Sequence, residues 1–434
     1  MTYKEDDIEY KRVVVTGMGI ISPCGTGLET FWENIIAGKP AITEIQGFDP
    51  SGFKSQIAGQ VMDFNPRQHG LSESQINRSD RYTQFALAGT RMAMDHSALD
   101  MDGIDPERIG VSISNAIAGT KFMEEEFLRL TENGTRPIDM TWASKALSQA
   151  FSFNVASSEV AAEYNCNGPC TTLPTGCAGG LDAIGFSLEC IRSGDVDVMI
   201  TGASEAPLTP ITVGAFDVVG ALSSKRNHIP AQASRPFDRD RDGFVIGEGC
   251  GILILEEMEF ARNRGATILA EVSGYGSSCN AFHMTDLHPS GKALAAALDV
   301  ALRDACMDPE RVDYISAHGS STPQNDVSET AALKRVLGDH AYEIPVSSLK
   351  SMCGHALAAA NSIAGVAAVL SIEHNQVHPT INYEFPDPDC DLNYVPNEAI
   401  EAEVNVAVKI GSGFSGIHSA VVFNDPEYHM EAVS

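Results

Sequence analysis

Short apolar runs that end in glycine or small polar residues recur along the chain, and each is typical of a buried strand. Between them lie longer segments in which the apolar residues follow the helical period. The predicted strands cover residues 12–19, 109–114, 196–201, 251–255, 312–317, 344–348 and 420–423. The predicted helices cover residues 28–37, 177–192, 293–305 and 356–370.

The later part of this pattern repeats the earlier part. The run 312–317 parallels the run 109–114, and the run 344–348 leads into a helix much as the segment before Cys177 does. Alternating strands and helices indicate a layered α/β fold with parallel strands. We expect two matching halves, residues 1–255 and 256–434, that pack as one body.

Composition restricts the classes of function. The 434 residues are 43% hydrophobic and 20% charged, which is typical of a globular protein. The net charge of −29 disfavours nucleic acid and anionic membranes as partners. An acidic protein partner would need a local basic patch, for which the candidates are Arg67 with Arg78 and Arg81, or Lys225 with Arg226. Each of these alone is more often a solvated surface.

No apolar run reaches the length that a membrane span requires, and the polar, acidic start of the chain argues against a secretory signal. The ten cysteines are scattered along the chain. Only Cys166 and Cys170 lie close together, and no second close pair could complete a zinc site. A reduced, cytoplasmic enzyme without a metal fits this pattern best.

Cys177 lies where an apolar strand signal stops and a helical pattern starts, between glycines at 176, 179 and 180. The free N–H groups and the positive dipole end of a helix N-terminus favour a thiolate, which is the nucleophilic form of cysteine. An isolated cysteine is more often a buried core residue. Cys177 is therefore a candidate nucleophile only if other segments support it.

Three further segments place polar residues near predicted strand ends. One holds His318, with Glu329 on the following helix; the second holds Lys350 and His355; the third is the glycine-rich segment 411–416, which contains Phe414. Ligand sites in α/β folds gather at strand ends. Taken singly, the histidines favour structural roles, the lysine and glutamate favour surface roles, and the glycine-rich segment favours a hairpin turn.

Together these segments resemble the three motifs of condensing β-ketoacyl synthases. The matching sequences are Pro-Thr-Gly-Cys-Ala-Gly-Gly (174–180), Ala-His-Gly-Ser-Ser-Thr (317–322) and Ser-Leu-Lys-Ser-Met-Cys-Gly-His (348–355). Segments 234–244 and 281–285 also resemble family segments, and the resemblance runs in order from about Arg12 to Phe423. It implies a duplicated, thiolase-like fold with five αβαβα layers.

Within the family, the Cys177 segment, Gln324-Asn-Asp326 and Gly-Ser-Gly-Phe-Ser-Gly (411–416) are similar to the ketosynthase alpha subunit of type II aromatic polyketide synthases. Fatty-acid enzymes usually carry Gly-Phe-Gly-Gly-Thr-Asn where this chain has Gly-Phe-Ser-Gly-Ile-His. Ketosynthases of this subgroup commonly show Thr-Ser after the cysteine, whereas this chain has Ala178 and Gly179. That departure concerns the shape of the acyl pocket.

The resemblance implies a role for each candidate residue. Cys177 takes the acyl chain from a phosphopantetheine thioester, and the N–H groups of Cys177 and Phe414 form the oxyanion hole. His318 and His355 stabilise the enolate formed when a malonyl extender loses CO₂. The remaining implied roles are support of the histidines by Lys350 and Glu329, contacts to pantetheine by Thr285 and Thr322, and gating of the acyl pocket by Phe414. The resemblance implies no metal or redox cofactor.

The resemblance also implies two partners, an acyl carrier protein and, in a heterodimer, a chain-length factor. The nearest alternative is a homodimeric fatty-acid 3-oxoacyl-carrier-protein synthase II, which shares every catalytic residue. A chain-length factor normally lacks the nucleophilic cysteine, so Cys177 argues against that class. A thiolase uses a second catalytic cysteine, for which only Cys353 invites comparison, and we interpret Cys353 as a packing residue.

Overall fold

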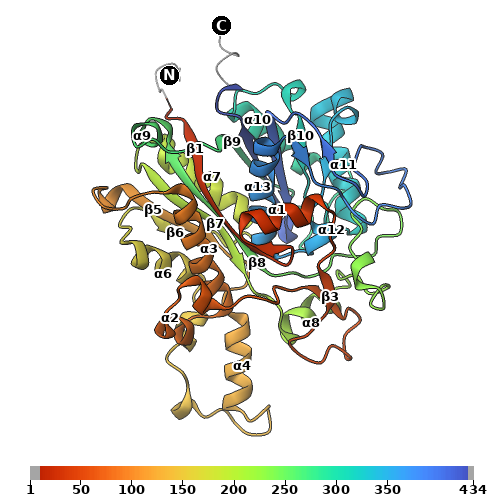
Figure 1. Ribbon diagram of the computed structural model, residues 1–434. Coiled ribbons are helices and arrows are strands. Elements are labelled where there is room, and N and C mark those ends of the chain that lie inside the picture. The colour runs from red at the N-terminus through yellow and green to blue at the C-terminus, as the bar shows by residue number, and fades with distance from the viewer. Residues whose placement is uncertain (1–9, 429–434) are drawn as a thin grey trace.

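The computed structural model describes residues 10–428, and one eleven-stranded mixed sheet runs through it (Figure 1). The acidic start of the chain, on which the argument against a secretory signal depends, lies outside the described residues. The sheet strands are β1 (Val13–Ser22), β2 (Gly25–Thr26), β5 (Ile109–Ser114), β6 (Cys170–Thr171), β7 (Val198–Glu205), β8 (Gly249–Glu257), β9 (Ala270–Cys279), β10 (Tyr314–Ser316), β11 (Val346–Ser347), β14 (Val406–Ser412) and β15 (Ile417–Asn424). Two small two-stranded sheets are formed by β3 (Ile42–Glu44) with β4 (Ile57–Gly59) and by β12 (Gln376–Val377) with β13 (Ile400–Glu401).

Helices cover both faces of the main sheet and fill the space between its two halves (Figure 1). They are α1 (Leu28–Ile36), α2 (Glu73–Arg78), α3 (Arg81–Ser97), α4 (Thr120–Leu130), α5 (Leu147–Ala150), α6 (Val155–Tyr164), α7 (Gly179–Arg192), α8 (Pro210–Val218), α9 (Met258–Asn263), α10 (Lys292–Asp304), α11 (Pro323–Leu337), α12 (Lys350–Cys353) and α13 (Leu357–His374).

The strand order reveals two matching halves. Apart from β2, the order is β11-β10-β14-β15-β9 and then β1-β8-β7-β5-β6, so each half holds five strands that run outward from a central strand. The halves join where Val14 and Val15 of β1 pair with Glu271 and Ala270 of β9. The division after residue 255 stays a prediction; it falls inside β8, which runs to Glu257.

The expectation of parallel strands is only partly right. β5 pairs parallel with β6 and β7, and β10 pairs parallel with β11 and β14, but the pairs of β8 with β1 and β7, and of β15 with β14 and β9, are antiparallel. The β14–β15 connection shows the reason. Residues 413–416 are too few for a crossover helix, so the chain returns as a hairpin.

The predicted five-layer arrangement is present. α7 and α13 form the central layer: α13 contacts β8 and β14, and α7 contacts β7 and β9. α3 and α6 cover the outer face of one half, and α10 and α11 cover that of the other. The central helices approach closely because Gly180 faces α13, where a Cβ atom would lie 2.8 Å from the carbonyl oxygen of Ala358.

By length and composition, α13 is long and apolar enough to cross a membrane. No uninterrupted apolar run indicates this in the sequence, because polar residues such as Asn361 and Ser362 interrupt the helix. Within the protein 89% of that helix is buried, as is typical of a central helix in a layered fold. The sequence pattern also missed α3, β9 and β14. It predicts that a strand signal stops at the Cys177 junction, and the structure has β6 ending at Thr171, with an irregular segment leading from there to Cys177.

Candidate active site

A cavity of about 280 Å³ opens where the two halves meet, and six of the eight predicted site residues line it. These are Cys177, Thr285, His318, Thr322, His355 and Phe414. The other two, Lys350 and Glu329, are buried behind the lining and contact the backbone that carries His318. Sequence segments up to 240 residues apart are thus brought to one place, as the matching strand ends predict.

Cys177 lies in a single 3₁₀ turn, Gly176–Ala178, that leads directly into α7. Its carbonyl oxygen accepts a hydrogen bond of 2.6 Å from Nδ2 of Asn361 on α13, which fixes the turn against the central layer. The N–H groups of Phe414 and of Cys177 itself are directed at the sulfur. The predicted oxyanion-hole donors therefore lie beside the nucleophile.

The position of Cys177 favours a thiolate, but burial acts against it. Burial raises the pKa of Cys177 to about 11, although the ammonium group of Lys350 and the two backbone N–H groups act in the opposite direction. Glu205 at the end of β7 raises it further. Cys177 is only partly buried at the wall of the cavity, but at this raised pKa its thiol is protonated at neutral pH, so transfer of an acyl group needs a nearby base.

His318 and His355 supply two neutral rings in the same cavity. Their centroids lie 5.2 Å apart at a steep angle. Burial lowers the pKa of each ring well below its usual value, and Lys350 lowers both further. A neutral imidazole has one N–H donor and one acceptor nitrogen, so each ring can donate a hydrogen bond or accept a proton.

The backbone around His355 is held by a glycine and by two hydrogen bonds. Gly354 has φ +73° and ψ −169°, a conformation essentially restricted to glycine. The N–H of His355 donates to the Val245 carbonyl at 2.7 Å, and the N–H of Gly247 donates to the His355 carbonyl at 2.9 Å. Gly354 of the motif 348–355 thus allows the backbone conformation that places His355.

Glu329 and Lys350 hold the backbone at His318 rather than its ring. The carboxylate of Glu329 accepts from the N–H groups of His318 at 2.5 Å and Gly319 at 2.7 Å. Nζ of Lys350 donates to the His318 carbonyl at 2.6 Å. Burial raises the pKa of Glu329 to about 7, with a further contribution from Asp326. This arrangement fits the support role that the resemblance implies.

Sequence reasoning missed Lys409, Asn361 and Glu205. Lys409 is fully buried in β14, and its ammonium donates to the carbonyls of Ser316 and Ala317 just before His318. A single lysine within the apolar run 404–410 is the signal that could have found it. Glu205 and Asn361 gave no comparable signal, because isolated polar residues at element ends and in helices are common.

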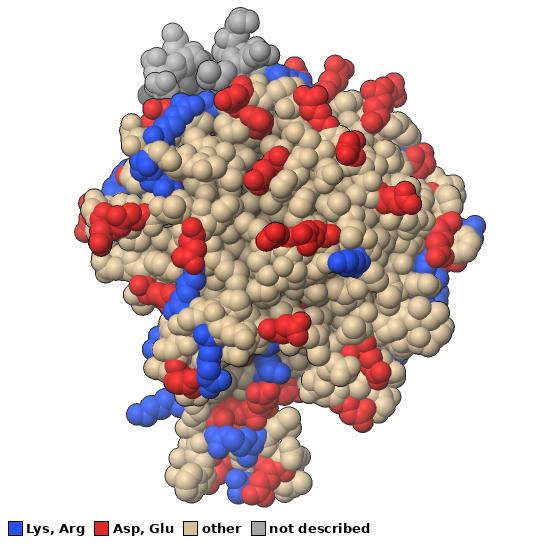
Figure 2. Space-filling model, viewed as in Figure 1, with Lys and Arg blue, Asp and Glu red and all other residues tan. Residues whose placement is uncertain are grey.

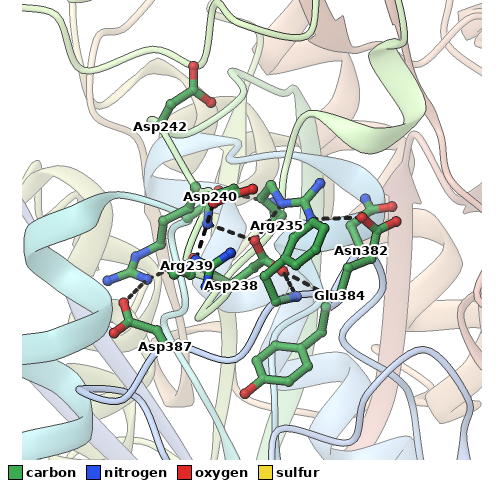
Figure 3. A network of polar contacts seen from close by, with 12 residues as sticks. Arg235, Asp238, Arg239, Asp240, Asp242, Asn382, Glu384 and Asp387 are labelled. Atoms are coloured by element: carbon green, nitrogen blue, oxygen red, sulfur yellow. Dashed lines mark hydrogen bonds and ion pairs between the residues drawn. The ribbon is translucent and has the colours of Figure 1, made fainter.

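A polar network anchors the segment 234–244, whose residues Asp242, Gly243 and Phe244 line the cavity (Figure 3). Asp238 accepts from Nε of Arg235 at 2.8 Å and from the N–H groups of Glu384 and Phe385. Nη1 of Arg241 donates to Asp387 at 2.6 Å, and Nε of Arg241 lies 3.5 Å from Asp326. The network therefore ties one wall of the cavity to the helix that carries Glu329.

The predicted threonines and Phe414 form the remaining walls. Thr322 caps α11 by accepting from the N–H of Asn325, and Thr285 lies in the loop after β9. Phe414 is half-buried, and its ring lies 6.0 Å from that of Phe216. Phe216 contacts Phe244, which in turn lies 5.2 Å from the His355 ring. An aromatic wall thus runs from the predicted gate to the histidines.

The surroundings of the cavity distinguish the two candidate basic patches. Arg67, Arg78 and Arg81 form ion pairs with Glu73, Glu159 and Glu248, which neutralises the first patch. Lys225 and Arg226 follow the wall residues Gly220 and Ala221 in the sequence, and they do not themselves line the cavity. Figure 2 shows carboxylates scattered over one face, without a continuous basic patch.

Within residues 10–428 no cluster of three or more His, Cys, Asp or Glu side chains could hold a metal ion.

Two family models match the chain: β-ketoacyl synthase, N-terminal domain, over residues 10–261, and β-ketoacyl synthase, C-terminal domain, over residues 269–384. The tetracenomycin polyketide synthase ketoacyl synthase alpha subunit of Streptomyces glaucescens is 48% identical over 418 residues, which are 96% of this chain and 98% of that protein.

Solved structures agree with these matches. A type II polyketide synthase acyl-carrier protein in complex with its ketosynthase bound to the hexaketide (AntDE:AntF) contains a chain that is 48% identical, with a TM-score of 0.90 over 96% of this chain and 100% of that one. The ishigamide ketosynthase/chain length factor contains a chain that is 35% identical, with a TM-score of 0.88 over 96% and 100% of the two chains.

Proposed function

The chain belongs to the β-ketoacyl synthase family, and from that premise we propose that it is the condensing subunit of a type II polyketide synthase. It joins an acyl or polyketide chain held on Cys177 to a malonyl unit held on an acyl carrier protein, with loss of CO₂. The observation that carries the condensation chemistry is the presence of two histidines and a cysteine in one cavity, and the polyketide assignment rests on the 48% identity to the type II polyketide relatives.

The first step transfers the acyl chain to Cys177. The sulfur attacks the thioester carbonyl, a new S–C bond forms, and the S–C bond to the carrier's phosphopantetheine breaks. Because the Cys177 thiol has a pKa of about 11, a neutral imidazole of the site accepts its proton and passes it to the departing pantetheine thiolate. The N–H groups of Cys177 and Phe414 stabilise the oxyanion, and loss of one such donor typically costs about 10²–10³ in rate.

The second step forms the carbon–carbon bond. Loss of CO₂ from the malonyl group leaves an enolate whose oxygen accepts hydrogen bonds from the N–H donors of His318 and His355. The enolate carbon attacks the acyl carbon on Cys177, the S–C bond breaks, and the released thiolate takes a proton from water to regenerate the resting thiol. Lys350 and Glu329 act through the His318 backbone, and Thr285 and Thr322 contact the pantetheine arm in the cavity.

The substrates are carried on phosphopantetheine, and the proposed chemistry uses no metal or redox cofactor. The carrier protein docks beside the wall residues Val219 to Ala221, which lie close in sequence to Lys225 and Arg226 and follow the exposed Val218. An acidic carrier would meet positive charge here despite the net charge of −29. Cys24, Cys250, Cys353 and Cys390 are buried thiols, which supports a reducing, cytoplasmic location.

Replacement of the nucleophile tests the proposal. We expect Cys177→Ala to abolish condensation and acyl labelling while the circular dichroism spectrum and Tm stay close to those of the wild type, because the thiol makes no bond that the fold needs. The measurement is intact and peptide mass spectrometry after incubation with an acyl carrier substrate. Cys170→Ala, at an exposed cysteine, is the matched control and should label normally. Label retained on another cysteine in Cys177→Ala would contradict the assignment.

A homodimeric fatty-acid synthase remains the second candidate, because it would use the same catalytic residues. The specific observation against it is the segment Gly-Phe-Ser-Gly-Ile-His (413–418), which departs from the fatty-acid pattern. The thiolase alternative has no support at Cys353. That thiol is buried against Cys24 and donates to the carbonyls of Leu349 and Gly354 rather than lining the cavity.

A further inference from the structure

Lys409 is a charged residue in a place where charge is costly. It lies in the middle of β14, opposite Ser316 of β10, and its side chain is fully buried. A buried ammonium group costs several kcal/mol unless it is hydrogen-bonded or paired. Its Nζ donates to the Ala317 carbonyl at 2.8 Å and to the Ser316 carbonyl at 3.1 Å.

The lysine belongs to a set of contacts that surrounds the backbone of residues 316–319. Lys350 donates to the next carbonyl, that of His318, so three consecutive carbonyls accept from buried ammonium groups. On the other side, Glu329 accepts from the N–H groups of His318 and Gly319. The N–H and the carbonyl of His318 and three of the neighbouring backbone groups are thus bonded to buried lysine or glutamate side chains.

We propose that Lys409 is a second positioning lysine of the condensation site, which holds the backbone that presents His318 and, with Lys350, sets a positive potential at the two histidine rings. The inference rests on the proposed function, because it assigns a role in that reaction. Lys409 does not line the cavity, so it acts through His318 and His355 and not on the substrate.

Electrostatics supports this role. Burial and Lys350 lower the pKa of His318 and His355, and Lys409 lowers both further. The pKa of Lys409 itself lies well below its usual value because of burial and Lys350, while Glu329 opposes this shift. The elements packed against β14 carry these further ionisable side chains: Tyr314 of β10, His418 of β15, Cys177 of the turn before α7, Glu373 and His374 of α13, and Lys292, Asp299, Arg303 and Asp304 of α10. His378, which follows α13, has its pKa lowered by burial and also by Lys409.

Two substitutions separate the roles of backbone support and charge. Lys409→Met removes both, whereas Lys409→Gln keeps an N–H donor for the carbonyls without the charge. We expect Lys409→Met to lower kcat by about 10- to 100-fold, as losses of supporting contacts typically do, with little change in KM for the malonyl carrier. Lys409→Gln should recover part of kcat. In both variants the acid limb of the kcat profile should move to higher pH, because the histidines protonate more easily.

A titration without substrate provides the second measurement. In protein with ¹³C-labelled histidine, His318 and His355, assigned by single replacement, should protonate at a higher pH in both variants than in the wild type. Lys334→Met, on the helix that carries Glu329, is the matched control, because Lys334 pairs with Asp391 at the surface. It should leave the profile and the titration unchanged.

Unchanged kcat in Lys409→Met, or a loss that is equal at every pH with unshifted histidines, would overturn the inference. If Lys409→Met does not fold, Lys409→Gln gives the same histidine test, and unshifted histidines in it would equally overturn the inference. The titration needs no substrate. A wild type that fails to condense malonyl units would therefore contradict the proposed function, while the histidine shift would still decide the charge role of Lys409.

Discussion

The Cys177 thiol lies next to a helix N-terminus, a lysine and two directed N–H groups, yet its pKa is raised to about 11 because burial outweighs all three. A protonated resting thiol fits a site that must exclude water. At neutral pH the proposed acyl transfer therefore needs a neutral histidine to accept the thiol proton, whereas without that help the thiol ionises only as the pH approaches its raised pKa. The same burial keeps His318 and His355 neutral.

This balance predicts the pH dependence of alkylation. A free cysteine ionises near pH 8.5. We expect the rate at which iodoacetamide modifies Cys177 to keep rising with pH up to about 11, because the thiolate fraction follows the raised pKa. Peptide mass spectrometry over a pH series measures this rate. Lys350→Met should lower it at every pH below that value, since Lys350 lowers the thiol pKa, whereas Lys334→Met should not. A plateau near pH 8.5 in the wild type would contradict the prediction.

At this scale the sequence predicted which residues meet but not their ionisation. The motif residues reach one cavity because their spacing places each near the end of a strand or the start of a helix. The state of Cys177 depends on surrounding atoms from segments far away in the chain, which no local pattern reports. Lys409 was not predicted for a related reason: its hydrogen-bond acceptors are the carbonyls of Ser316 and Ala317, which lie far from it in the sequence.

At the scale of elements, the hydrophobic pattern predicted most of the strands and helices that carry the site, and it failed on their directions. A strand that is buried on both faces has the same apolar sequence pattern whether its neighbours in the sheet are parallel or antiparallel. The β14–β15 hairpin shows the consequence, because the glycine-rich segment was assigned to a turn while β14 before it was missed. That hairpin brings Lys409 and Phe414 to the site from one element pair.

The short connection between α12 and α13 offers a test of how an element end positions a catalytic ring. A Cβ atom at Gly354 would lie 2.9 Å from the Val245 carbonyl oxygen. We expect Gly354→Ala to cost at least about 3 kcal/mol of stability, because strain adds to the close contact. We also expect it to lower kcat by about 10²-fold, as a 1 Å displacement of a catalytic group can. Denaturant unfolding and steady-state kinetics measure the two effects.

Gly265→Ala is the matched control, because Gly265 has φ +74° and no atom within 4 Å of the added Cβ atom. It should cost about 1–2 kcal/mol, the usual penalty of a left-handed non-glycine residue, and leave kcat unchanged. Equal effects of the two substitutions on kcat would show that the backbone at Gly354 does not control the position of His355.

At the scale of the whole molecule, the two halves of the sheet end differently. Both edge strands, β6 and β11, have two residues, but Cys170 of β6 is exposed whereas both residues of β11 are buried. The segment that begins with α4 and precedes α6 projects from the body in Figure 1, and it carries the exposed side chains of Phe127, Ile138, Met140, Trp142 and Phe151. Apolar side chains gathered near a sheet edge are typical of a subunit interface.

This surface leads to a prediction about assembly. We expect native mass spectrometry of the protein purified from its own cells to show a one-to-one complex with a homologue of similar size that lacks the nucleophilic cysteine, as the ketosynthase/chain-length-factor arrangement requires. Trp142→Glu should weaken the complex, because it would bury an unpaired charge in the interface. Val300→Glu, on the outer helix α10 of the other half, is the matched control and should leave the complex intact. A symmetric homodimer of this chain alone, with ordinary fatty acyl products, would instead assign the enzyme to fatty-acid synthesis, since the catalytic residues are the same in both classes and only the partner distinguishes them.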